Sequence, residues 1–177
     1  MLRMILFRHA KAARHAGGGD HERPLETRGQ KAAARMGRWL AESPWRPDLA
    51  VTSDARRTRE TLAIAGQAFT PALPVIAEPR IYEASAAMLL ALARETPDRI
   101  GTLLAVGHNP GFAETALNLV REGPSADLAR LRTKFPTAAM AVIAFDVAHW
   151  RDLDWGLGRL EAFVTPASLD DEFDDHE

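Results

Sequence analysis

The sequence contains no cysteine among its 177 residues. Disulfide bonds, thiolate nucleophiles and cysteine-ligated metal sites are therefore excluded. It also lacks any run of about 18 consecutive apolar residues, so no membrane-spanning helix is expected. A secretory signal peptide is not expected either, because Arg8 and Lys11 follow the first apolar run too closely. Together these absences predict a cytoplasmic protein that does not associate with a membrane.

An excess of positive charge is missing as well. The formal net charge is -2, which gives no basic surface of the kind that binds nucleic acid. The hydrophobic fraction of 46% and the charged fraction of 26% are ordinary for a globular protein, and the length suits one domain. Residues 8–60 are rich in arginine, whereas residues 170–177 are strongly acidic. We therefore expect one domain over residues 1–166, followed by an acidic, disordered tail over residues 167–177.

Short apolar runs alternate with segments of helical periodicity along the chain. Strands are predicted at residues 2–7, 48–53, 75–77, 101–107, 138–146 and 158–165. Helices are predicted at residues 28–42, 54–65, 85–94 and 112–120, and residues 121–133 are expected to be partly helical. Thr27 is the expected N-cap of the first helix, and Ser53 or Asp54 that of the second.

This alternation predicts an α/β fold. Strands separated by helices form a mainly parallel central sheet with helices on both faces, which is a three-layer α/β/α sandwich. The last two strands are joined by a short connection, so they are expected to be antiparallel to each other. The predicted sheet therefore has an antiparallel C-terminal edge.

Side chains that can bind an anion follow three of the predicted strands. Arg8-His9 follows the first strand, Ser53 and Arg56-Arg57 follow the second, and His108-Asn109 follows the strand over residues 101–107. The carboxyl ends of parallel strands lie at one edge of a sheet, where ligands bind. Two histidines and two arginines close together are unfavourable unless an anion lies among them. Because the guanidinium fork matches phosphate oxygens, the sequence predicts a phosphate pocket with His9 as its nucleophile.

Each of these residues also has a structural interpretation. A single histidine after a strand is more often a structural residue than a catalytic one. A run of arginines on a helix is usually a solvated face, and Glu60 can pair with it. Glu83 can pair with Arg80 or with an arginine of the site. A catalytic role is favoured only because all these groups occur together at the carboxyl ends of three predicted strands.

Four segments of the chain resemble the histidine phosphatase (phosphoglycerate mutase-like) superfamily. Arg8-His9-Ala10 resembles its Arg-His-Gly signature, with alanine in place of the usual glycine. Residues 53–61 are similar to its Ser-x-x-x-Arg-x-x-x-Thr segment, which selects Arg57 over Arg56. Residues 24–29 and 106–109 resemble two further segments, the Pro-Leu-Thr-x-x-Gly stretch and the one that carries the second histidine.

The compact length also resembles one branch of this superfamily, the SixA-type phosphohistidine phosphatases. Residues 135–139, which precede a predicted strand, are similar to that branch as well. The resemblance implies a phosphoglycerate mutase-like fold and a phosphatase that needs no metal or other cofactor. It implies that His9 forms a covalent phosphohistidine while Arg8, Arg57 and His108 hold the phosphoryl oxygens. The candidate general acid is Glu83, and the further candidates for substrate binding are Ser53 and Asn109.

The resemblance implies a phosphorylated protein histidine as the substrate, with a histidine phosphotransfer domain as a candidate partner. A small-molecule phosphomonoesterase or mutase of the same superfamily is the alternative within the enzyme class. A non-catalytic phosphate-binding adaptor is the alternative outside it, and it predicts that one of the four central residues is missing, which is not the case.

Overall fold

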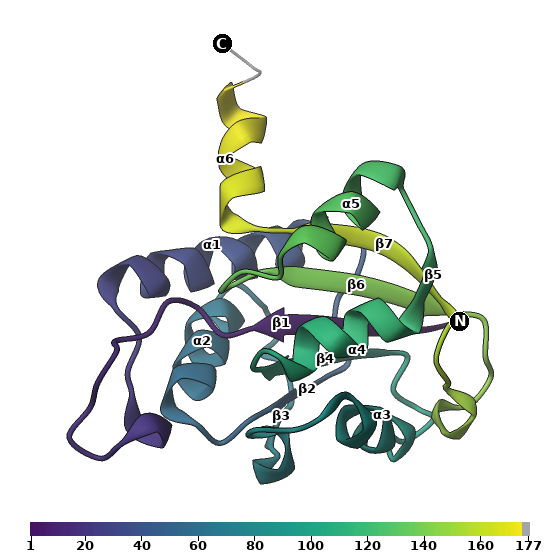
Figure 1. Ribbon diagram of the computed structural model, residues 1–177, viewed down its shortest axis with the longest axis horizontal. Coiled ribbons are helices and arrows are strands. Elements are labelled where there is room, and N and C mark those ends of the chain that lie inside the picture. The colour runs from purple at the N-terminus through teal and green to yellow at the C-terminus, as the bar shows by residue number, and fades with distance from the viewer. Residues whose placement is uncertain (175–177) are drawn as a thin grey trace.

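The computed structural model describes residues 1–174, with side chains as far as Asp170. Figure 1 shows the arrangement of its helices and strands. The strands are β1 (Leu2–Arg8), β2 (Leu49–Thr52), β3 (Val75–Ala77), β4 (Thr102–Gly107), β5 (Val120–Glu122), β6 (Met140–Phe145) and β7 (Gly158–Val164). The α-helices are α1 (Thr27–Glu42), α2 (Arg56–Gly66), α3 (Ala86–Arg94), α4 (Gly111–Leu119), α5 (Ser125–Thr133) and α6 (Pro166–Asp174). Short 3-10 helices are η1 (Asp20–Glu22), η2 (Pro79–Ile81) and η3 (Trp150–Asp152).

All these strands form one sheet in the order β3-β2-β4-β1-β6-β7-β5. Strands β3, β2, β4 and β1 are parallel neighbours, and β6 is antiparallel to both β1 and β7. The predicted mainly parallel sheet with an antiparallel C-terminal part is therefore confirmed. Strand β1 lies near the middle, with β4 on one side and β6 on the other.

The two faces of the sheet carry separate hydrophobic clusters. Because side chains alternate along a strand, Met4 and Leu6 of β1 face one cluster while Ile5 and Phe7 face the other. The first cluster includes buried residues of α3, α4 and α5, and the second includes residues of α1, α2 and α6. In Figure 1, α4 lies in front of β1. This arrangement is the predicted three-layer α/β/α sandwich.

The helix starts differ from the predicted N-caps. Helix α1 has Glu26 as its N-cap and α2 has Ala55, and neither helix start carries a side-chain cap. Thr27 is therefore the first helical residue rather than a cap, and Ser53 and Asp54 lie before the cap of α2. Propensity alone places such boundaries only to within a few residues.

The segment after α4 was only partly predicted. Residues 125–133 form α5 as expected, but Val120–Glu122 form the edge strand β5, which pairs with β7. This strand is short and its last two residues are exposed, so it has no apolar run to reveal it. Tertiary pairing with β7, nearly 40 residues later in the chain, creates it.

The predicted disordered tail is wrong as far as Asp174, because α6 covers Pro166–Asp174. Thr165 and Ser168 exchange hydrogen bonds, with Thr165 N donating to Ser168 Oγ at 2.9 Å and Ser168 N donating to Thr165 Oγ1 at 3.0 Å. This reciprocal cap starts the helix, proline suits its first position, and Leu169 packs into the core. The rest of the predicted tail, residues 175–177, lies outside the described residues.

None of the helices within residues 1–174 combines the length and the apolar character needed to cross a bilayer.

Candidate active site

Three neighbouring parallel strands end side by side at one edge of the sheet. After β1, the backbone N–H of His9 donates to the Gly107 carbonyl of β4 at 3.0 Å. After β2, the N–H of Ser53 donates to the Val106 carbonyl at 3.0 Å. His9, Ser53 and His108 therefore leave adjacent strands at the same level, as the sequence predicted.

His9 is buried, with 7% of its surface exposed. Its Nδ1–H donates to the Ala10 carbonyl at 2.8 Å, so the lone pair of the neutral ring is on Nε2. Burial, assisted by the charges of Arg57 and Arg8 and opposed by the Ala10 hydrogen bond, lowers the pKa of His9 to about 4. A neutral imidazole with a free Nε2 is the form of histidine that can act as a nucleophile.

His108 lies beside His9, with the ring centroids 5.4 Å apart. Burial, followed by the charge of Arg57, lowers its pKa to about 3. Its Nε2 lies 2.8 Å from Ser53 Oγ, and that oxygen accepts the N–H of Ala55 at 3.2 Å. When the Ser53 hydroxyl donates to Nε2, the proton of the neutral ring is on Nδ1, which has no partner among the described residues. Neutral His108 can then still donate to a phosphoryl oxygen.

Each of the two arginines of the site has one terminal guanidinium nitrogen bound to a backbone carbonyl. Arg8 Nη1 donates to the Phe135 carbonyl at 3.0 Å, and Arg57 Nη1 donates to the Asp20 carbonyl at 2.9 Å. The Nε of each arginine is buried and has no partner among the described residues. A buried donor without a partner is costly, more so on a charged group. An oxyanion that accepts from these donors removes that cost.

Thr61 connects the elements that carry His9 and Arg57. Its Oγ1 donates to the Arg57 carbonyl at 2.7 Å and accepts the N–H of Ala10 at 3.0 Å. The hydroxyl therefore fixes the turn after β1 against the first turn of α2. This contact gives a physical reason for the spacing of arginine and threonine in the motif over residues 53–61.

Gly29 explains another of the segments that carry the resemblance. A Cβ at this position would lie 2.1 Å from the Lys11 carbonyl oxygen. Only glycine allows α1 to approach the turn after β1 so closely. Gly29 thus supports the site by packing against the turn after β1.

Asn109 uses both ends of its amide within the chain. Its Nδ2 donates to the Phe135 carbonyl at 2.8 Å, and its Oδ1 accepts the N–H of Ala113 at 3.3 Å. The Phe135 carbonyl also accepts from Arg8. This geometry favours Asn109 as a support of Arg8, and direct contact between Asn109 and the substrate stays a prediction.

Glu83 lines a cavity of about 470 Å³ together with Arg57, His108 and Glu114. Its backbone has φ 58°, which is unusual for a residue other than glycine and is typical of functional sites. Within the described residues, the Glu83 side chain makes no hydrogen bond or ion pair. Arg80, its predicted structural partner, instead binds Glu78 and Glu95. The carboxylate is therefore free to meet a ligand in the cavity.

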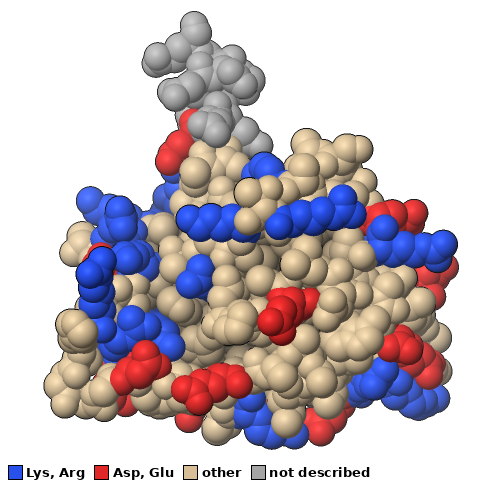
Figure 2. Space-filling model, viewed as in Figure 1, with Lys and Arg blue, Asp and Glu red and all other residues tan. Residues whose placement is uncertain are grey.

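The charge around the site is mixed. Figure 2 shows Lys and Arg side chains gathered over the left part of the face where the loop after β1 lies, with acidic side chains directly below them. Among the residues that line the cavity, Arg57 is cationic and Asp20, Glu83 and Glu114 are acidic. The cavity lining thus combines one arginine, Arg57, with three carboxylates, and one of these, Asp20, is paired with Arg57.

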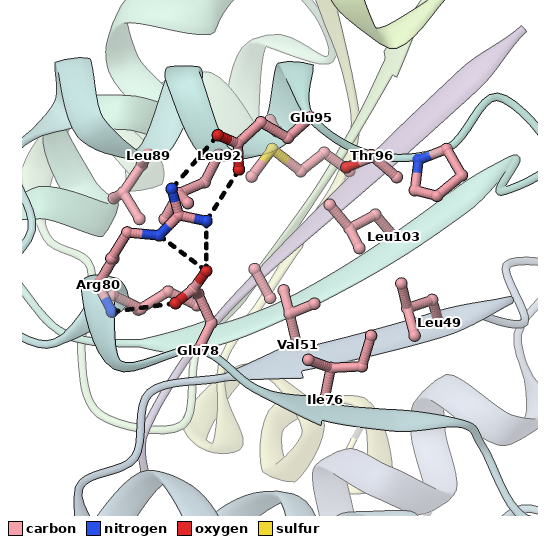
Figure 3. A pocket seen from close by; sticks show the side chains of 15 residues that line it. Leu49, Val51, Ile76, Glu78, Arg80, Leu89, Leu92, Glu95, Thr96 and Leu103 are labelled. Carbon is pink, nitrogen blue, oxygen red and sulfur yellow. Dashed lines mark hydrogen bonds and ion pairs between the residues drawn. The ribbon is translucent and has the colours of Figure 1, made fainter.

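A second hollow, of about 190 Å³, lies between α3 and the strands β2 and β4 (Figure 3). Its lining is mostly aliphatic, including Leu49, Val51 and Leu103. The charged side chains at its mouth are already paired, because Arg80 binds both Glu78 and Glu95. None of the residues that line it is a histidine and its charged side chains are all paired, so the chemistry belongs at the sheet edge.

Sequence reasoning missed two residues that touch this edge, Asp20 and Tyr82. Tyr82 O–H donates to Asp20 Oδ2 at 2.5 Å, and the Tyr82 ring meets His108 edge-on with the centroids 5.5 Å apart. Asp20 lies in a glycine-rich loop without periodicity, which gave no signal. Thr61 belongs to the motif over residues 53–61, but the sequence does not predict its contact with Ala10, and so it does not predict the role of its hydroxyl.

The fold and this edge of the sheet define an α/β protein with a buried, neutral histidine beside Arg8 and Arg57. The family model for the histidine phosphatase superfamily (branch 1) matches residues 4–102, and the chain belongs to this superfamily. The predicted enzyme class, a phosphatase, is thereby confirmed.

Relatives cover almost the whole chain. The uncharacterized Mycobacterium tuberculosis protein Rv1276c is 35% identical over 162 residues, which are 90% of this chain and 99% of that protein. A solved structure from Nakamurella multipartitia, provisionally named phosphohistidine phosphatase SixA, is 32% identical with a TM-score of 0.80 and covers 93% of this chain and 96% of its own. The protein histidine phosphatase SixA complexed with tungstate is 22% identical with a TM-score of 0.73, covers 95% and 99% of the two chains, and shares the fold. The predicted SixA-type branch is confirmed.

Proposed function

We propose that the protein is a metal-independent phosphatase that removes the phosphoryl group from a protein phosphohistidine through a covalent intermediate on His9. One observation carries the proposal. Three buried nitrogen donors without partners, Arg8 Nε, Arg57 Nε and His108 Nδ1, belong to the residues around a histidine that is neutral and has a free Nε2. This arrangement supports a phosphoryl group as the reaction centre.

The reaction follows in two steps. His9 Nε2 attacks phosphorus in line, the new N–P bond forms, and the bond to the leaving group breaks with its electron pair on the leaving atom. Water then attacks the phosphohistidine, and the N–P bond breaks to release inorganic phosphate and neutral His9. Arg8, Arg57 and His108 balance the charge on the equatorial oxygens in both steps. Since these groups already supply the positive charge, the proposed mechanism needs no metal.

The substrate assignment rests on the resemblance to the SixA-type structures, one of which carries the name phosphohistidine phosphatase. Phosphohistidine has a good leaving group, so it places little demand on a general acid. A histidine phosphotransfer domain is the corresponding partner. A small phosphate ester is the second candidate, because a cavity of about 470 Å³ is large enough to hold a small molecule.

A substrate panel with the wild type and His9→Ala tests this proposal. We expect turnover of phosphohistidine peptides and p-nitrophenyl phosphate by the wild type, full activity in EDTA, and an acid-labile phosphoenzyme that is lost in His9→Ala. His15→Ala, which changes an exposed histidine of the same loop, is the control and is expected to behave like the wild type. Turnover that survives in a folded His9→Ala variant would overturn the nucleophile. A loss of activity in EDTA that a divalent ion restores would overturn the metal-independent mechanism.

A further inference from the structure

Asp20 binds the outer end of Arg57 through two of its oxygens. Its carbonyl oxygen accepts from Arg57 Nη1 at 2.9 Å, and its carboxylate Oδ2 accepts from Arg57 Nη2 at 3.2 Å. The Arg57 side chain is almost fully buried, whereas the Asp20 side chain is 54% exposed. Both terminal nitrogens of the guanidinium are therefore engaged from the solvent side, and the buried Nε is left without a partner.

Two further side chains hold the Asp20 carboxylate in this position. Tyr82 O–H donates to Oδ2 at 2.5 Å, and Arg23 forms an ion pair with Oδ1, in which its Nε lies 3.0 Å away without hydrogen-bonding geometry. The carboxylate thus has a partner on each oxygen besides Arg57. These contacts, with the charge of Arg57, lower the pKa of Asp20, so it is ionised near neutral pH.

The loop after β1 is shaped to bring Asp20 to this place. Gly19, directly before it, has φ 89°, a conformation that glycine adopts without strain. The next residue, His21, anchors the loop to the start of α2, with its Nε2 3.0 Å from Asp54 Oδ1. The loop is therefore fixed at two neighbouring residues, Asp20 and His21. These contacts hold Asp20 against Arg57.

We propose that Asp20 is a positioning residue, which holds the guanidinium of Arg57 so that its unpartnered Nε–H faces the phosphoryl group. The inference rests on the proposed phosphatase function and adds a residue to it. Arginine has several rotatable bonds, and a contact that fixes its fork before the substrate arrives removes that freedom from the cost of reaching the transition state. Asp20 itself does not touch the reacting atoms.

The same contact allows an opposite outcome. If the Asp20 carboxylate instead competes with the phosphoryl group for Arg57, removing it will lower KM and leave kcat unchanged. If Asp20 positions Arg57, removing it will lower kcat. The two roles therefore move different kinetic constants.

Kinetics of Asp20→Ala and Asp20→Asn separate the two roles. We expect kcat to fall about 10- to 100-fold in Asp20→Ala, as for other small misplacements of a catalytic group. Asp20→Asn keeps an oxygen that can accept from Arg57 and Tyr82, so it is expected to recover most of the loss. Glu22→Gln removes one negative charge from the same 3-10 helix without touching Arg57, and it is the matched control. An unchanged kcat in Asp20→Ala would overturn the inference.

A spectroscopic measurement tests the positioning without relying on turnover. In ¹H–¹⁵N spectra of the arginine side chains, a held guanidinium gives separate Nη signals because rotation about the Nε–Cζ bond is slow. We expect separate signals for Arg57, assigned by their absence in Arg57→Lys, in the wild type and Glu22→Gln, and their coalescence in Asp20→Ala. Separate signals that persist in Asp20→Ala would overturn the inference. A wild type without phosphatase activity would instead overturn the proposed function, and this spectrum would still test the contact.

Discussion

The imidazole rings of His9 and His108 lie 5.4 Å apart and tilted by 53°, and both have pKa values far below that of a free histidine. Burial disfavours an imidazolium ion at both positions, and the positive charge of nearby Arg57 disfavours it further. The site therefore keeps its positive charge on the arginines and its histidines neutral. In the proposed reaction, neutral His9 can therefore attack phosphorus, and neutral His108 can donate a hydrogen bond to a phosphoryl oxygen.

The lowered pKa of His9 predicts a loss of stability in acid. His9 takes up a proton near pH 6.5 in the unfolded chain but only near pH 4 in the folded protein. The free energy of unfolding is therefore expected to be largest above pH 6.5 and to decline as the pH falls toward 4. Between pH 6.5 and pH 5, His9 contributes a decline of about 2 kcal/mol. Urea unfolding at pH 7 and pH 5 measures it.

His9→Gln removes this titration and is expected to reduce the difference between the two pH values. His15→Gln, at an exposed position, serves as the control and is expected to keep it. A pH dependence in His9→Gln equal to that of the wild type would show that His9 is not the source.

Adjacent arginines of α2 are expected to respond very differently to the same substitution. Arg57 is buried at the site, whereas Arg56 is exposed and pairs with Glu60 at 2.7 Å. Lysine keeps the charge but loses the planar fork. We expect Arg57→Lys to lower kcat/KM about 100-fold or more, by analogy with the loss of other oxyanion donors, and Arg56→Lys to change it less than about twofold. Equal effects on kcat/KM would contradict the assignment of Arg57.

Thr61 is expected to matter through its hydroxyl alone. Thr61→Val has nearly the same shape but leaves the buried N–H of Ala10 without its acceptor. We expect it to lower the free energy of unfolding by about 1–3 kcal/mol and to lower kcat as well, because both His9 and Arg57 lose their common support. Thr61→Ser keeps the hydroxyl and is expected to retain activity. A serine variant as impaired as the valine variant would point to the methyl group instead. Thermal unfolding and steady-state kinetics provide both measurements.

Glu83 is expected to matter in proportion to the quality of the leaving group. If Glu83 donates a proton, Glu83→Gln will slow the hydrolysis of alkyl phosphates more than that of aryl phosphates or phosphohistidine, because poor leaving groups need the proton. Glu114→Gln changes another acidic residue of the same cavity and is the control. Equal slowing of every substrate by Glu83→Gln would argue against an acid role.

Most of the site was predictable because strand ends are local features of a sequence. An apolar run ending in Arg8-His9, and another ending in Gly107-His108, identify the two histidines, and parallel strands bring them together. The resemblance of residues 53–61 to the superfamily motif separates Arg57 from Arg56, and the structure buries the one and exposes the other. The hydrophobic periodicity of the sequence therefore predicts the layers of the fold and the edge of the sheet at which the site lies.

What was not predictable depends on contacts between distant residues. Asp20 meets Arg57 across 37 positions of the chain and Tyr82 across 62. Arg8 is held by the carbonyl of Phe135, and a carbonyl has no signature in a sequence because every residue has one. The helix at the C-terminus was missed for another reason. Its acidic composition suggested disorder, while the exchange of hydrogen bonds between Thr165 and Ser168 starts a helix.

The hydrogen bond from His9 Nδ1 to the Ala10 carbonyl also decides the chemical isomer of the intermediate. Since Nδ1 carries the proton, the phosphoryl group of the proposed intermediate is attached to Nε2, the ring nitrogen farther from the backbone. A ³¹P spectrum of the trapped protein should therefore show the tele isomer of phosphohistidine and none of the pros isomer. A single carbonyl of the main chain thus sets the regiochemistry of the reaction.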